Sequence, residues 1–305
     1  MRLDAKGIPF KLLDTHLCPA CEGVGMRLLS GPRPEYVVQC RKCKSTFFEF
    51  GVGEALSHNN QYSSEVEYQG YLDVANESSL HIRHEATIDR LRALLSAVDS
   101  PRLFDVGAGA GDFLARARAR GFRIAGNEVS EPAIDACRLR HGIELMHGDD
   151  LVGIASDTGR CDAVTMWCVI AHVDDPRQLL KGTKALLRPG GVLFFSTPRY
   201  CTIDRVSLIL RWLTGDRFRR MFDRRINGAH RRQYSRWGIE SFLRREGFTP
   251  IDIAPAIGYG LQMDAYLSSV GAPRFIARPL GKLLEFLAEA GLAPRNILNV
   301  YAESS

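Results

Sequence analysis

Three glycines, Gly107, Gly109 and Gly111, follow a short apolar stretch that ends in Asp105-Val106, and a predicted helix follows them. Glycine lets the backbone turn tightly and lets a ligand approach it without meeting a Cβ atom. The first N–H groups of a helix have no partner within it and lie at its positive end. A strand, a glycine turn and a helix in this order predict a site for a nucleotide-type cofactor, although many tight turns share the glycine pattern.

Acidic residues end the next two predicted strands. Residues 122–128 read as a second strand that ends in Glu128, and a carboxylate at this strand end can accept both hydroxyls of a ribose. Residues 143–150 read as a third strand that ends in Asp149 and Asp150, where an acid suits an adenine amino group. The register of this loop cannot be read from a sequence, so both aspartates remain candidates.

Four of the eight cysteines form two pairs, Cys18-Pro-Ala-Cys21 and Cys40-Arg-Lys-Cys43, which are separated by 18 residues. Each pair presents two sulfurs on one tight turn, so together they can deliver four thiolates to one tetrahedral zinc ion. Disulfides are disfavoured in a reducing compartment, and a redox pair would not explain two copies. A site with four cysteine ligands is closed, which predicts a structural metal and a zinc ribbon at residues 12–50 that needs the metal to fold.

These residues need elements that hold them together, and the apolar stretches predict seven strands. They lie at residues 103–106, 122–128, 143–150, 161–176 with the following loop, 186–198 with the preceding turn, 249–254 and 297–302. An amphipathic helix is predicted at residues 81–98, within a helical cap or linker at residues 51–100. The core is expected at residues 101–305, where helices at 259–266 and 279–290 cover it with apolar residues: Leu280, Leu283, Leu284, Phe286 and Leu287.

Two details separate this series from a nicotinamide dehydrogenase. The glycine run starts from Asp105 in the form Asp-Val-Gly-Ala-Gly-Ala-Gly, and residues 167–172 and 188–191 match later motifs that dehydrogenases lack. The ordered series resembles the class I S-adenosylmethionine (SAM) methyltransferases over roughly residues 60–305. The resemblance implies an α/β, Rossmann-like fold with a seven-stranded, mostly parallel sheet and helices on both faces, here joined to the small N-terminal ribbon.

The resemblance also implies a role for each residue around the glycine loop. The glycines shape the loop around the methionine part of SAM, with Asp105 near the amino group and Glu128 at the ribose. Adenine is assigned to Asp149 or Asp150, and Trp167 in the later motif is a further candidate cofactor contact. In similar enzymes a tyrosine ahead of the core touches the cofactor's carboxylate, and three candidates precede it here: Tyr62, Tyr68 and Tyr71.

Two histidines are candidates for the general base that a hydroxyl acceptor needs, because histidine has a pKa near neutrality. His172 lies in the loop after the fourth strand, which faces the cofactor's reactive end in this family. His230 opens a segment, residues 228–248, that resembles the family pattern of a histidine, an aromatic residue and a helix ending in Gly-Phe. The sequence favours His230 as the base, with His172 as the alternative or as a positioning residue.

Positive charge is concentrated between residues 204 and 246, which hold twelve arginines, no lysine and five acids. This net charge of +7 compares with +5 for the whole chain. The segment overlaps the place, about 202–236, where the resemblance puts a substrate lid. Because arginine binds phosphate and carboxylate in a bidentate way, the segment predicts one of three substrates: a phosphorylated or nucleotide-linked small molecule, a lipid-linked substrate at a membrane surface, or RNA.

The favoured hypothesis is a SAM-dependent methyltransferase that acts on a small molecule, at a hydroxyl of a sugar-, phosphate- or lipid-linked or natural-product substrate. The basic lid would then allow peripheral membrane contact. The alternative is an RNA methyltransferase whose lid and zinc ribbon hold RNA; against it, Trp167-Cys-Val-Ile stands where base-amine methyltransferases carry Asn-Pro-Pro-Tyr. A third hypothesis, from a different class, is a SAM-binding scaffold without catalysis whose ribbon docks a partner protein.

Length and composition set outer limits on these hypotheses. With 305 residues, of which 45% are hydrophobic, the chain is long enough for one good core and an appendage. No apolar run approaches the ~20 residues that span a bilayer, and the first residues lack the apolar core of a secretory signal. These observations predict a cytoplasmic protein and indicate no particular oligomeric state.

Overall fold

The computed structural model describes residues 17–30, 35–50, 77–214, 230–258, 262–269 and 271–305, and these divide between two compact units. We call Asn60–Thr197, Leu243–Ala254 and Asn299–Ser305 the core unit. The ribbon unit comprises Met1–Asn59, Pro198–Phe242 and Pro255–Leu298. The candidate tyrosines ahead of the core and residues 215–229 of the expected lid lie outside the described residues.

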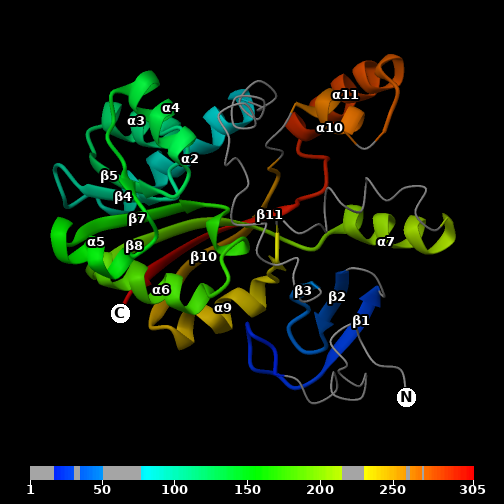
Figure 1. Cartoon of the computed structure of the whole chain (residues 1–305), viewed down its shortest axis with the longest axis horizontal. Coiled ribbons are helices and arrows are strands. Elements are labelled where there is room, and N and C mark those ends of the chain that lie inside the picture. Colours follow the sequence, from blue (N-terminus) through cyan, green and yellow to red (C-terminus); the bar gives the residue numbers. More distant parts are fainter. Residues whose placement is uncertain (1–16, 31–34, 51–76, 215–229, 259–261, 270) are drawn as a thin grey trace. The chain divides into compact units, whose positions relative to one another are not determined.

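A seven-stranded sheet forms the centre of the core unit (Figure 1). Its order is β10 (Phe248–Ala256), β11 (Ile297–Ser304), β8 (Leu187–Pro198), β7 (Cys161–Trp167), β4 (Arg102–Val106), β5 (Arg123–Glu128) and β6 (Met146–His147). The pairs β8–β7, β7–β4, β4–β5 and β5–β6 are parallel. The predicted seven-stranded, mostly parallel α/β sheet is therefore confirmed, with β11 inserted between β10 and β8.

The order of the strands reverses at β4, which pairs with β5 on one side and with β7 on the other. A reversal of this kind leaves a crevice at the carboxyl ends of parallel strands, where ligands bind. Gly107 follows β4 directly, Glu128 ends β5 and Trp167 ends β7. The sheet thus places the residues that the sequence singled out at one edge, around the reversal.

Helices cover both faces of this sheet (Figure 1). One face carries α2 (Glu77–Leu94), α3 (Asp112–Ala119) and α4 (Glu131–His141), and the other carries α5 (Leu151–Thr158) and α6 (Pro176–Leu186). The buried cluster joins α2 and α3 to the sheet, through Ile88, Leu91, Phe113, Leu114, Leu103 and Phe194. Because burying one such side chain contributes about 1.5–3 kcal/mol, this cluster gives the core unit a stable interior of its own.

The ribbon unit holds a smaller sheet of four strands, β1 (Met26–Ser30), β2 (Glu35–Cys40), β3 (Thr46–Phe50) and β9 (Arg232–Gln233). The first three form an antiparallel meander. The fourth comes from the segment after the expected lid, and pairs Gln233 with Thr46 and Arg232 with Phe47. Val37 and Phe48 are buried against Leu29 and against Leu208 of α7 (Thr202–Thr214). The ribbon is therefore built from residues that are far apart in the sequence.

Two helices near the C-terminus correct an expectation. α10 (Met263–Ser269) and α11 (Arg274–Glu289) pack so closely that a Cβ atom on Gly281 would lie 2.8 Å from the Asp264 nitrogen. The small residues Ala277 and Gly281 of α11 are buried, whereas Leu283 and Phe286 are exposed. The predicted apolar covering was wrong for Leu280, Leu283 and Phe286, which are exposed, whereas Leu284 and Leu287 are half-buried.

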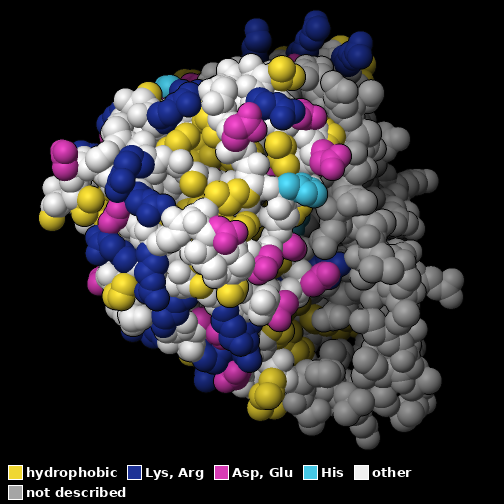
Figure 2. All heavy atoms as spheres, turned by 60° about the vertical axis from the view of Figure 1, so that its left-hand side comes forward, with side chains coloured by type: hydrophobic (Ala, Val, Ile, Leu, Met, Phe, Trp, Pro, Cys, Tyr) yellow, Lys and Arg dark blue, Asp and Glu magenta, His cyan; other side chains and the backbone are white. Residues whose placement is uncertain are grey.

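The surface of the side that carries α3 to α5 in Figure 1 is seen in Figure 2. Basic side chains form a band along one side, while acidic side chains gather nearer the middle with apolar side chains between them. Within the described residues, no helix combines the length and the apolar character needed to cross a membrane.

Candidate functional site

The glycine loop has a backbone that side chains would disturb. Gly107, Gly109 and Gly111 have φ values of +67°, +55° and +78°, in the left-handed region that favours glycine. A Cβ atom on Gly107 would lie 2.8 Å from a methyl group of Val169, and one on Gly111 would overlap the Cys137 sulfur. The loop is therefore held close to its neighbours, and it turns directly into α3 at Asp112.

Glu128 ties the end of β5 to this loop. One of its carboxylate oxygens accepts the Gly109 N–H at 2.9 Å, and the other accepts the N–H groups of Val129 at 2.8 Å and Ser130 at 3.0 Å. Each carboxylate oxygen offers about two acceptor positions, so the oxygen that accepts the Gly109 N–H retains about one position for a hydroxyl of a ligand, and the group is half-buried. The predicted ribose residue thus lies beside the glycine loop.

Asp105 is an acid inside the sheet. It is fully buried, and the Thr165 hydroxyl of the neighbouring strand donates a hydrogen bond of 2.6 Å to it. Burial raises the pKa of Asp105 to about 8, with a smaller contribution from the charge of Glu128. A buried carboxylate is stabilised in its charged form by a cation placed next to it. This residue therefore suits a ligand that carries an ammonium group.

The two candidate aspartates after β6 have different roles in the chain. Asp150 is the N-cap of α5, because its carboxylate accepts the Gly153 N–H at 3.1 Å. Asp149 is exposed, and its backbone carbonyl accepts the Leu151 N–H at 2.9 Å. A capping carboxylate contributes about 1 kcal/mol to the stability of a helix. The sequence could not separate these residues because the cap depends on where the helix begins.

Trp167 lies in a group of rings that sequence reasoning did not find. Its ring is 4.6 Å from that of His84, 5.2 Å from Phe113 and 5.0 Å from Phe194, and the Arg83 guanidinium lies over it at 5.2 Å. Burial lowers the pKa of His84 to about 3, so this imidazole is neutral. Arg83 and His84 come from α2, and no motif in the sequence marked them.

Several buried polar atoms of the core unit have no hydrogen-bond partner within the described residues. Three of them lie at or next to the carboxyl ends of sheet strands: the side-chain oxygen of Asn127 in β5, the indole nitrogen of Trp167 in β7 and the hydroxyl of Thr197 in β8. Leaving a buried polar atom unsatisfied costs about 1–3 kcal/mol, and native proteins satisfy most such atoms. These atoms therefore fit a site where a bound ligand or water completes the hydrogen bonding.

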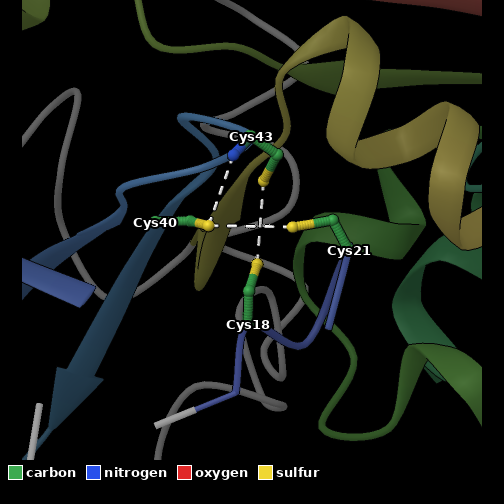
Figure 3. Close-up of side chains that lie close together, drawn as sticks. All are labelled: Cys18, Cys21, Cys40 and Cys43. Atoms are coloured by element: carbon green, nitrogen blue, oxygen red, sulfur yellow. Dashed lines mark hydrogen bonds between the residues drawn. The ribbon is translucent and has the colours of Figure 1, made fainter. Parts of the chain in front are cut away.

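The four predicted zinc ligands converge in the ribbon unit, as Figure 3 shows. The sulfurs of Cys18 and Cys43 are 3.7 Å apart, and so are those of Cys21 and Cys40. Tetrahedral zinc with Zn–S bonds of ~2.3 Å separates its sulfurs by about 3.8 Å, whereas a disulfide needs ~2.05 Å. The spacing of the four sulfurs thus fits one tetrahedral metal.

The backbone of the two cysteine turns supports the same reading. The Glu22 N–H bonds the Cys18 carbonyl at 2.8 Å, and the Lys44 N–H bonds the Cys40 carbonyl at 3.1 Å. Glu22 and Lys44 both have left-handed backbones, with φ of 53° and 65°. The Cys43 N–H also donates to the Cys40 sulfur at 3.3 Å, and such bonds favour the charged thiolate. The two pairs are therefore matching turns that present sulfurs in the same way.

The cysteine cluster is connected to the segment after the expected lid. The Ser45 hydroxyl lies 3.3 Å from the Cys43 sulfur and accepts the Ser235 N–H at 3.0 Å. The Ser235 hydroxyl is 3.2 Å from that of Ser45 and accepts the Gly238 N–H at 2.9 Å, within the first turn of α9 (Arg236–Arg245). The predicted metal site, strand β9 and the start of α9 thus form one hydrogen-bonded structure.

The two candidate bases lie in different units. His172, in the core unit, follows a short 3₁₀ turn (Val169–Ala171). Its backbone N–H donates to the Val169 carbonyl at 2.9 Å. His230, in the ribbon unit, stands two residues before β9, next to Arg231, whose carbonyl accepts the Phe48 N–H at 2.9 Å. Both imidazoles are half-buried.

The sheet order, the glycine loop and the acid at the end of β5 define an α/β protein of Rossmann-like architecture with a nucleotide-type cofactor site. The chain belongs to the methyltransferase domain family, because the sequence pattern of that family matches residues 79–253, more than half of the chain. The resemblance to the class I SAM-dependent methyltransferases is thereby confirmed, and the family supports SAM as the cofactor of the core unit.

Individual proteins similar to this chain cover parts of it. A ubiquinone biosynthesis O-methyltransferase of Xanthomonas oryzae pv. oryzae is 32% identical over 130 residues, which are 40% of this chain and 52% of that protein. One from Coxiella burnetii is 34% identical over 100 residues, 31% of this chain and 42% of that protein. The chain thus spans about half the length of the curated relatives it matches.

A solved structure agrees with the fold. Magnesium protoporphyrin IX methyltransferase (ChlM) from Synechocystis PCC 6803, with bound SAH, has a TM-score of 0.52 to this chain at 14% identity. The similarity covers 83% of this chain and 100% of that one. At this level of identity the comparison establishes a shared fold and leaves the substrate open.

Proposed function

We propose that this protein is a SAM-dependent methyltransferase whose acceptor is a hydroxyl of a small molecule. The observation that carries the proposal is the set of polar groups at one edge of the sheet: the buried acid Asp105, the glycine loop bonded to Glu128, and buried polar atoms without partners at the ends of β5, β7 and β8. The relatives named O-methyltransferase support an oxygen acceptor.

The residues of the core unit would hold SAM as follows. The glycine loop surrounds the methionine part, Asp105 pairs with the amino group, and Glu128 accepts a ribose hydroxyl at its remaining acceptor position. Because Asp150 already caps α5, Asp149 is the better candidate for the adenine amino group. Trp167 borders the site with its unsatisfied indole N–H. SAM supplies a methyl group already activated on a sulfonium, so alignment and exclusion of water are the main tasks of the protein.

A hydroxyl acceptor must lose its proton as the methyl group arrives, and an imidazole can take it. We assign this role to His230, which β9 and the ribbon hold in place, and keep His172 as the alternative. The arginine-rich segment that contains His230 suits an acceptor bearing phosphate or carboxylate. This arrangement would bind the acceptor through arginine and deprotonate it through histidine.

We further propose that Cys18, Cys21, Cys40 and Cys43 hold a structural zinc ion. The sulfur spacing of 3.7 Å in two independent pairs supports tetrahedral coordination. With four cysteine ligands no position remains for a substrate. The metal would therefore hold the ribbon and strand β9 together and take no part in the methyl transfer.

Transfer of label from tritiated SAM into a cell extract, with and without ribonuclease, tests the function. We expect labelled small, ribonuclease-resistant products with the wild-type protein and none with Gly109→Arg, which blocks the glycine loop, or with His230→Ala. His230→Ala should still bind SAM in calorimetry, which separates loss of the base from loss of the cofactor site. Label in a ribonuclease-sensitive polymer would instead make the arginine-rich segment an RNA-binding surface.

A further inference from the structure

Helix α11 buries its small residues and exposes its large ones. Ala277 and Gly281 face the interior, while Phe275 is 78% exposed and Phe286 64% exposed. Three more large apolar residues of this helix are exposed with them: Ile276, Leu280 and Leu283. Exposed apolar side chains gathered on one element mark an interaction surface more often than scattered ones do. This helix therefore presents an apolar face that a partner would cover.

The helix cannot turn to bury these side chains. A Cβ atom on Gly281 would lie 2.8 Å from the backbone of Asp264 in α10, so no larger residue fits at this contact. Glu285, one turn further on, accepts the Met263 N–H at 3.0 Å and joins the same two helices. The close packing against α10 thus determines which face of α11 is exposed.

A row of cations runs beside the apolar face. Arg274, Arg278 and Lys282 are exposed and lie four residues apart, so they follow one line along the helix. Of the two acids in the helix, Glu285 is bonded to the backbone of α10 and Glu289 lies at the end. An apolar face flanked by cations complements a surface that is apolar inside and anionic at its rim.

Helix α7, in the same unit, is arranged in the same way. It buries Asp204 and Ser207, and it exposes Arg205. Its large exposed side chains are Val206, Ile209, Trp212 and Leu213, and Trp212 is 83% exposed. Tryptophan favours the boundary between water and lipid. Two helices of the ribbon unit thus carry polar or small residues inside and large apolar residues outside.

We propose that α11 docks on the surface of an anionic phospholipid bilayer, with α7 as a second contact. The apolar face of α11 enters the boundary between headgroups and acyl chains, and its three cations bind lipid phosphates. Its 16 residues extend about 24 Å along the surface. The proposal does not depend on the methyl-transfer activity. The sequence predicted membrane contact through the basic lid at about residues 202–236, and the proposal assigns the main contact to α11.

Flotation of the full-length protein with vesicles tests this proposal. We expect binding to vesicles of phosphatidylcholine with about a third phosphatidylglycerol, and binding at least tenfold weaker to pure phosphatidylcholine, because the cations contribute. The double variant Phe275→Ser/Phe286→Ser should bind the anionic vesicles at least tenfold more weakly. Arg278→Gln/Lys282→Gln should lose most of the preference for anionic vesicles and keep the weak binding to neutral ones.

Leu139→Ser is the matched control, because Leu139 is an 83% exposed leucine on α4 of the core unit. It should bind vesicles as the wild type does, and all variants should keep the wild-type melting temperature and SAM affinity. Absence of wild-type flotation, or equal flotation of the Phe275→Ser/Phe286→Ser variant, would overturn the proposal. So would a dimer in sedimentation that these serine substitutions dissociate, since a second copy of the chain would then cover the face.

Discussion

The core unit and the ribbon unit are stabilised in different ways. The core unit has a large buried cluster in which two helices pack against the central strands. The ribbon sheet has Val37 and Phe48 as its buried cluster, with Leu29 and Leu208 against them, and four cysteines that converge at its end. Hydrophobic burial can stabilise the first alone, whereas the second needs a metal to supply what its small core lacks. The cofactor site should therefore survive changes that unfold the ribbon.

Removal of the metal should have the largest effect. Structural zinc contributes about 10–16 kcal/mol of apparent binding free energy in small zinc domains. We expect a strong chelator, or Cys40→Ser, to abolish amide hydrogen-exchange protection at Phe48 and in β9, while SAM affinity in calorimetry changes less than twofold. A parallel loss of SAM affinity would contradict the independence of the two units. Cys161→Ser, at a buried cysteine of β7, is the control and should leave metal content unchanged.

Asp105 should make the stability of the core unit depend on pH. Its pKa of about 8 lies above the ordinary value of 3.8, so between these values the folded state holds a proton that the unfolded state has lost. Stability should thus fall as the pH rises from about 4 to about 8, by at most about 1.4 kcal/mol per pH unit. Urea unfolding at several pH values measures this slope without SAM.

Asp105→Asn is the variant for this test, and it should remove most of the slope. Pairing with the amino group of SAM would expel the proton from Asp105, so SAM affinity of the wild type should rise over the same pH range. The neutral amide introduced by Asp105→Asn has no such proton to release, and the variant should lose this rise. A wild-type affinity that is constant between pH 5 and 8 would remove Asp105 from the cofactor site.

Gly111→Ala should destabilise the core unit by about 3 kcal/mol, since it combines a left-handed backbone with a Cβ atom that overlaps the Cys137 sulfur. Gly142→Ala is the matched control. Gly142 also has a left-handed backbone, with φ of 59°, but a Cβ atom there would meet nothing within 4 Å. Gly142→Ala should lower the free energy of unfolding by about 1–2 kcal/mol. Equal losses in urea unfolding would mean that the overlap is relieved by a shift of α4.

Loss of the hydrogen bonds between Ser45, next to the cysteine cluster, and Ser235, after the expected lid, should have the smallest effect on stability. Ser45→Ala and Ser235→Ala should each weaken the ribbon unit by about 1 kcal/mol, and the double variant by less than their sum. Hydrogen exchange at β9 measures the free energy of opening. Ser156→Ala, at an exposed serine that bonds its own helix, should change nothing there. Additive effects at Ser45 and Ser235 would show that the two hydroxyls do not act together.

Much of the core unit could be predicted because its signals are local. The glycine loop and Glu128 lie within 22 consecutive residues of β4, α3 and β5, and each strand shows as an apolar stretch. The third strand was predicted too long, since β6 pairs over Met146 and His147 alone. Arg83 and His84 were missed, because neither residue belongs to a motif and the helix that places them meets Trp167 through tertiary packing.

The order and spacing of residues were sufficient for the class of fold, the glycine loop and the four cysteines, since their signals are a series of apolar stretches, one run of glycines and two short Cys-x-x-Cys turns. The three-dimensional structure was needed for three other features. It pairs β9 with β3 of the ribbon and joins Ser45 to Ser235, 190 residues apart, it makes Asp150 a helix cap, and it exposes the apolar face of α11. Backbone pairing and close packing bring together residues that are far apart in the sequence. The residues next to each of them along the chain therefore do not reveal the partner.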